Sequence, residues 1–68
     1  MITNDDLIEL NKILPKTDKG NLNKMIYIYN KYNTPTLDGC TCSSQYRLTA
    51  RKTVLNWYNE LITENNGN

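Results

Sequence analysis

The segment SSQYRLTARKTVLNWYNELIT, residues 43–63, is the longest stretch of helix-forming sequence in the chain and decides its architecture. Its second half spreads large apolar side chains over a broad helical arc: Val54, Leu55, Trp57, Tyr58, Leu61 and Ile62. Ser43 or Ser44 is suited to cap this helix, because a serine hydroxyl accepts hydrogen bonds from the unpaired N–H groups of a first turn. We therefore predict one continuous helix over 43–63, followed by a frayed tail over 64–68.

The first half of this helix carries cations where the second half is apolar. Ala50 and Tyr46 continue the apolar side toward the start of the helix. Arg47 and Arg51 lie one turn apart along the middle of the same arc. The helix thus changes from cationic to apolar along one side.

Three explanations for this change stay open. In the first, the two arginines form ion pairs at the edge of the bundle with acidic residues near the start of the chain, while their stems cover apolar surface: Asp5, Asp6 or Glu9. In the second, the helix outruns a small core and its first half contacts another protein. In the third, the arginines and Lys52 contact phosphate near the helix N-terminus.

A first helix is predicted over 4–14. Thr3 or Asn4 caps it, and Pro15 ends it because proline disfavours helical geometry in the residue before it. One apolar stripe follows helical spacing and leaves Ile8 outside: Leu7, Leu10, Ile13 and Leu14.

A second helix is predicted over 20–33, with Asp18 as a candidate cap. Its apolar side chains gather on one side at about 100° per residue: Leu22, Met25, Ile26, Tyr29 and Tyr32. Residues 24–29 are also rich in strand-forming types, so a strand is the alternative there. We favour the helix because the stripe continues to Tyr32.

Turn chemistry fills the connection over 34–42, with Pro35 and the pair Asp38-Gly39. The pattern predicts an all-α fold, a small three-helix domain over 1–68, in which helices adjacent in sequence pack roughly antiparallel.

Composition limits the functions that this chain can have. Its 68 residues include 38% apolar and 22% charged types, with a net charge of +1 and no histidine. A chain of this size buries only about 60% of its unfolded surface, so its stability is marginal without a partner. Without imidazole and with few acids and bases, we predict no enzyme, no cofactor and no small-molecule substrate.

The sequence also predicts a location. Asp5 and Asp6 stand where a secretory signal carries cations, and the longest apolar runs are far shorter than the roughly 18 residues that span a bilayer. We expect no membrane association, and a location in the cytoplasm of the host cell or in a virion assembled there.

Cys40 and Cys42 are separated by one residue. A disulfide across so tight a ring is strained, so we expect reduced thiols, small and moderately buried, with the pKa of Cys42 lowered by the nearby helix N-terminus. Two thiols are too few for a zinc site, so we predict no metal unless two chains share one.

The stretch over 28–61 resembles small proteins of tailed bacteriophages, especially phages of gut Bacteroidetes, which contain a Cys-x-Cys cluster. The matching pieces are a Tyr-Asn pair, the two cysteines and two arginines: Tyr29, Asn30, Cys40, Cys42, Arg47 and Arg51. The resemblance implies a virion component or packaging accessory, and it implies no activity.

The leading functional hypothesis is a small interaction protein that docks on a larger protein assembly or on itself. The predicted contact residues are types enriched at interfaces, with Trp57 as their anchor in the core: Arg47, Arg51, Tyr46 and Tyr32. One alternative is a helix-turn-helix DNA-binding protein, a repressor or small terminase subunit, that uses Gln45, Arg47, Arg51 and Lys52. Another is an inhibitor of a host protein.

Overall fold

The computed structural model describes residues 2–16, 18–40 and 42–66. They form three helices, α1 (Asn4–Ile13), α2 (Lys19–Tyr32) and α3 (Ser44–Asn66), and contain no strand. The predicted all-α, three-helix fold is confirmed, and residues 24–29 are helical. The predicted end of the third helix at 63 is three residues short. Most of the tail expected to fray over 64–68 is therefore helical, and 67–68 lie outside the described residues.

Side-chain caps begin all three helices. Thr3, Asp18 and Ser43 each accept a hydrogen bond from the backbone N–H three residues further on, at N···O distances of 3.2–3.3 Å. These bonds satisfy N–H groups that have no partner inside the helix. At the other end of α1, the helix closes at Leu14, directly before Pro15.

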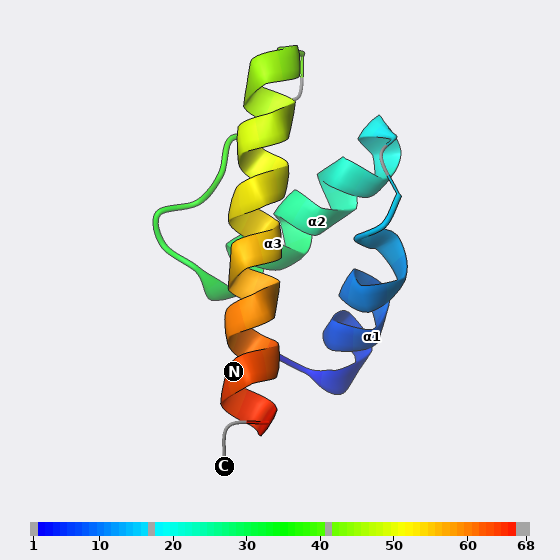
Figure 1. The fold of residues 1–68 in the computed structure, drawn as a ribbon. Coiled ribbons are helices and arrows are strands. Elements are labelled where there is room, and N and C mark those ends of the chain that lie inside the picture. Colours follow the sequence, from blue (N-terminus) through cyan, green and yellow to red (C-terminus); the bar gives the residue numbers. More distant parts are fainter. Residues whose placement is uncertain (1, 17, 41, 67–68) are drawn as a thin grey trace.

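The helices form an elongated body of 39 × 23 × 17 Å, with α3 along its long axis (Figure 1). α2 crosses α3 obliquely, and α1 packs mainly on α2. α1 and α2 run in roughly opposite directions, as predicted for helices joined by a short turn (Figure 1).

α2 and α3 run in the same general direction, so the antiparallel prediction is wrong for this pair. Leu22, near the start of α2, lines a hollow together with Ser44 at the start of α3. At the other end, the ring of Tyr32 stacks on Trp57 in the second half of α3, with centroids 6.1 Å apart. The connection over 33–43 makes this possible, because a segment of that length spans up to about 35 Å and returns the chain to the top of α3 (Figure 1).

This connection is fastened to the helices at two points. The side-chain amide of Asn30 donates to the carbonyl oxygen of Leu37 (2.9 Å) and accepts from its N–H (2.8 Å). The hydroxyl of Tyr46 donates to the carbonyl oxygen of Asp38 at 2.5 Å. The Thr34–Pro35 peptide bond is cis.

The core is built mainly by the first two helices. Among the residues whose burial is described, nine apolar side chains are buried. α3 contributes Ala50 and Val54, and the other seven are Leu10, Ile13, Leu14, Leu22, Met25, Ile26 and Ile28. Trp57 packs at the edge of this cluster and meets the ring of Tyr29 edge-on, at 5.4 Å.

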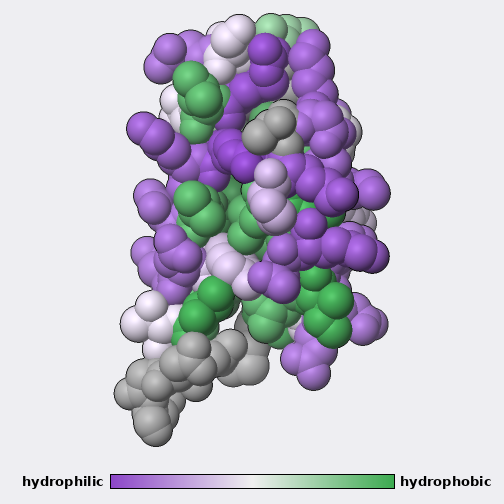
Figure 2. Space-filling model, turned by 45° about the vertical axis from the view of Figure 1, so that its right-hand side comes forward, coloured by the Kyte–Doolittle hydropathy of each residue, from purple (hydrophilic) through white to green (hydrophobic). Residues whose placement is uncertain are grey.

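Several large apolar side chains stay on the surface. Leu55, predicted as part of the core arc, is 42% exposed, because α3 touches the rest of the molecule along only one side. Ile8 is 66% exposed, as its position outside the stripe predicted. On the face shown in Figure 2, apolar surface forms separate patches between hydrophilic side chains.

Asp6 joins α1 to the end of α2. Its carboxylate accepts a hydrogen bond from the hydroxyl of Tyr32 and lies 3.3 Å from the Nζ atom of Lys31. The backbone N–H of Thr3 donates to the same Tyr32 hydroxyl at 3.4 Å. The hydrogen bond from Tyr32, followed by the contact with Lys31, lowers the pKa of Asp6 below its ordinary value.

Replacing Leu10 with alanine should lower the free energy of unfolding by about 2–5 kcal/mol, because the side chain is fully buried and its removal leaves a cavity. Ile8→Ala on the same helix is the matched control, and its exposed position predicts a change within about 0.5 kcal/mol. Urea unfolding followed by circular dichroism measures both. Equal losses in the two variants would contradict this core.

The contacts of Asp6 should make stability depend on pH in the acid range. Its pKa is lowered in the folded state, so its stabilisation is present above the unfolded pKa of about 3.9 and is lost as the pH falls through the folded pKa. Asp6→Asn should therefore unfold at lower urea concentrations than the wild type near neutral pH, and the gap should close in acid. Asp5→Asn, one residue earlier, controls for loss of a charge from the same turn. A gap for Asp6→Asn that is the same at all pH values would count against these contacts.

Candidate functional site

Arg51 bonds to the end of α1 from across the molecule. Its guanidinium donates to the carbonyl oxygen of Leu14 at 2.6 Å and to that of Lys16 at 2.7 Å. Carbonyl groups at a helix end have no partner inside the helix, so this cation supplies the missing donors. The proposed ion pairs of the arginines with Asp5, Asp6 or Glu9 are therefore wrong for Arg51, and Asp6 is paired with Lys31 instead.

Arg47 lies one turn earlier and reaches back over the start of α3. Its guanidinium donates to the carbonyl oxygen of Cys42 at 3.3 Å and to the hydroxyl of Ser44 at 3.2 Å. These bonds of the two arginines go to neutral oxygens, and they orient both guanidinium groups at the start of α3.

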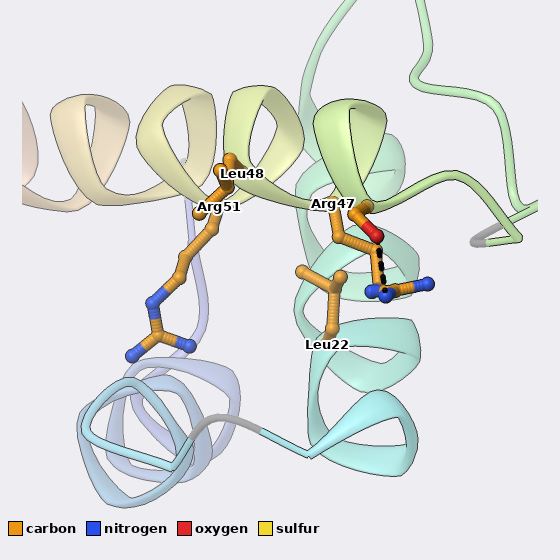
Figure 3. A pocket seen from close by; sticks show the side chains of 5 residues that line it. Leu22, Arg47, Leu48 and Arg51 are labelled. Atoms are coloured by element: carbon orange, nitrogen blue, oxygen red, sulfur yellow. Dashed lines mark hydrogen bonds between the residues drawn. The ribbon is translucent and has the colours of Figure 1, made fainter.

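The two guanidinium groups flank a hollow between α2 and the first half of α3 (Figure 3). The hollow has a volume of about 360 Å³, and its lining is Leu22, Ser44, Arg47, Leu48 and Arg51. Arg51 extends from α3 toward the end of α1, whereas Arg47 lies beside Leu22 (Figure 3). The hollow reaches that volume because it is open to solvent at the surface rather than enclosed.

Leu48 gives this hollow its exposed apolar wall, since 59% of its surface is accessible. The sequence analysis did not assign Leu48 or Leu22 to a functional site, although it placed Leu22 in the apolar stripe of the second helix. The signal for Leu48 was a leucine next to Arg47 that the predicted core arc left unassigned. The role of Leu22 follows only from the direction in which α2 crosses α3.

The two predicted tyrosines do not join this site. The Tyr46 hydroxyl fastens the connection at Asp38, and desolvation raises the pKa of Tyr46 above its ordinary value. The Tyr32 hydroxyl bonds to Asp6, and its ring stacks on Trp57. Both stabilise the fold, so only the arginines of the predicted contact set lie together.

The residues of the DNA-binding alternative are split between two sides of α3. At about 100° per residue, Gln45 and Lys52 share one side, and Arg47 and Arg51 lie roughly opposite. Gln45 and Lys52 are exposed, whereas the arginines are half-buried at the hollow. One groove of DNA cannot contact both sides at once. The connection over 33–43 is also longer than the three- to four-residue turn of a helix-turn-helix.

The two thiols differ from expectation in burial and in acidity. Cys40 and Cys42 are both exposed rather than moderately buried, and they are free thiols. The hydrogen bond from Cys42 lowers the pKa of Cys40, whereas the bond to Cys40 raises the pKa of Cys42, which we had expected to be lowered. The neighbouring sulfur therefore outweighs the charges of Lys19 and Arg47, which lower the pKa of Cys42. Within residues 2–16, 18–40 and 42–66, no three cysteine, aspartate or glutamate side chains are grouped to hold a metal ion.

Comparison with known proteins gives no relative: no protein-family model, curated protein or solved structure matches the chain. In the part of the chain that the structure describes, no helix has the length and apolar character needed to cross a membrane.

Removing the Arg51 guanidinium should release α3 from the end of α1. Arg51→Met keeps an apolar stem but no donor, and we expect it to lower the free energy of unfolding by about 1–2 kcal/mol. Lys52→Met, the next residue on the exposed side of α3, should change it by no more than about 0.5 kcal/mol. Urea titration of both variants decides. Equal effects would show that the bonds to Leu14 and Lys16 contribute little.

Proposed function

We propose that this chain is a non-enzymatic interaction module that docks on a protein partner through the arginine-flanked hollow. The observation that carries the proposal is the hollow itself, where Arg47 and Arg51 stand beside the exposed side chain of Leu48. An exposed leucine between two oriented cations fits a partner segment that presents an apolar side chain next to a carboxylate.

The chemistry of the two arginines supports this kind of partner. Each guanidinium has five N–H donors, and the bonds of Arg51 to Leu14 and Lys16 engage only two of its nitrogen atoms. Arginine pairs with carboxylates in a fixed fork geometry, and it is enriched among residues that dominate binding energy. The existing bonds already hold the Arg51 side chain in place, so this side chain loses less entropy when a partner binds.

The resemblance to small phage proteins suggests a component of a virion or of the packaging machinery as the partner. A host protein inhibited by the chain is an alternative that uses the same surface. Both need a rigid surface of defined charge and no reaction chemistry.

Selection of random peptides displayed as a library against the immobilised chain tests the proposal. We expect the selected peptides to share an aspartate or glutamate beside a large apolar residue. Arg47→Gln and Leu48→Ala should each weaken a selected peptide by about tenfold, which corresponds to about 1.4 kcal/mol. Lys52→Gln removes a charge from the other side of α3 and should change the affinity less than twofold.

Four results would contradict the proposal. Selected peptides without an acidic residue would remove the charge argument. Equal weakening by Lys52→Gln and Arg47→Gln would point to a general charge effect. Binding of duplex DNA that weakens with rising salt would favour the helix-turn-helix alternative. Dimerisation lost in Leu48→Asp would make a second copy of the chain the occupant of the hollow.

A further inference from the structure

Cys40 and Cys42 place two thiols side by side on the surface, outside the hollow. Their Sγ atoms are 3.2 Å apart, within the range of a sulfur–sulfur hydrogen bond, and both residues are exposed. A spacing of one residue keeps two cysteines near each other, but it does not make their sulfur atoms face each other. The folded loop does this.

Bonds to α3 and within the loop hold the backbone around the thiols. The carboxylate of Asp38 accepts from the backbone N–H of Cys40 at 3.0 Å, and the carbonyl oxygen of Asp38 is held by the Tyr46 hydroxyl. On the other side, the carbonyl oxygen of Cys42 accepts from Arg47. The backbone next to each thiol is therefore fixed on the start of α3.

The two thiols are chemically unequal. Hydrogen bonds from the thiol and the backbone N–H of Cys42 stabilise the thiolate of Cys40 and lower its pKa. The hydrogen bond with Cys40 raises the pKa of Cys42 above its ordinary value. An exposed thiol of lowered pKa beside a second thiol is the arrangement of cysteines that react reversibly with oxidants.

We propose that Cys40 and Cys42 form a thiol–disulfide exchange site that low-molecular-weight disulfides oxidise reversibly. The site does not depend on the docking function, because neither sulfur lines the hollow.

The reaction proceeds in two exchange steps. The Cys40 thiolate attacks one sulfur of the small disulfide, a mixed disulfide forms on Cys40, and the other half leaves as a thiolate. Cys42 then loses its proton to that thiolate or to water and attacks the Cys40 sulfur, which expels the second half. The chain loses two electrons and two protons, and the small disulfide becomes two thiols.

Ring strain makes the reaction reversible. A disulfide that bridges residues one apart departs from relaxed geometry, and strained disulfides are more easily reduced. Ordinary small thiols should therefore return the pair to the dithiol state seen here. The site responds to the balance of thiols and disulfides around it rather than forming a permanent crosslink.

An aromatic disulfide reagent, dithiobis-nitrobenzoate, tests the proposal because each exchange releases one coloured thiolate. The wild-type chain should release two equivalents and, by intact mass, lose two hydrogens with no adduct retained. Glutathione should then restore the original mass. A wild-type chain that keeps one or two adducts would overturn the proposal, because no ring closure would have occurred.

Single substitutions separate the two roles. Cys42→Ser should release one equivalent and keep its adduct on Cys40. Cys40→Ser should also release one equivalent and keep its adduct, on Cys42, because no second thiol is present to close the ring. Release of a second equivalent by either variant would overturn the proposal, because that equivalent is assigned to attack by the second thiol. Both positions are exposed loop sites, and circular dichroism checks that both variants fold.

Unfolding the chain in urea tests the contribution of the fold. Release of the second coloured equivalent reports ring closure, and it should slow when the loop is freed from α3. An equal rate in the folded and unfolded chain would show that the one-residue spacing alone, and not the folded loop, makes the pair reactive.

Discussion

The bonds from the Arg51 guanidinium to the carbonyl oxygens of Leu14 and Lys16 are the contact on which the arrangement of the functional surface depends. α1 packs mainly on α2, and polar bonds add to its contact with α3: those of Arg51, and one from the Tyr58 hydroxyl to the side chain of Asn11 at 2.7 Å. Hydrogen bonds with a charged donor are stronger than neutral ones, and carbonyls at a helix end otherwise need water. Arg51 thus ties the first half of α3 to the turn between α1 and α2, beside the hollow that Leu22 lines.

The small core explains why polar side chains are needed to tie α3 to the rest of the molecule. α3 extends about 35 Å along a body 39 Å long, but over residues 44–64 it buries only Ala50 and Val54. A helix that outruns its core leaves an apolar residue such as Leu48 without a partner inside the molecule. The first half of α3 therefore combines fixed cations with exposed apolar surface. Its second half packs on α2 through Trp57, which contacts the rings of Tyr29 and Tyr32.

Features set by neighbouring residues could be predicted from the sequence, because their physical causes are local. The caps at Thr3 and Asp18 and the end of α1 before Pro15 follow from side chains within a few positions. The common direction of α2 and α3 could not, because it depends on how the connection packs through Asn30. The partners of Arg51 were hidden for another reason: they are backbone carbonyls, which every residue carries, so no side-chain pattern marks them.

Arg47 contacts both candidate sites, the hollow and the thiol pair. Its guanidinium flanks the hollow, and it also donates to the carbonyl oxygen of Cys42. Bringing the two sulfurs from 3.2 Å to the roughly 2 Å of a disulfide bond requires rotation of the side chains and backbone that carry them. The acceptor of Arg47 belongs to that backbone, so ring closure would act directly on the orientation of one cation of the hollow. Arg51 is held by Leu14 and Lys16, far from the cysteines in sequence, and would keep its place. The hollow thus has one cation tied to the thiol pair and one that is independent of it.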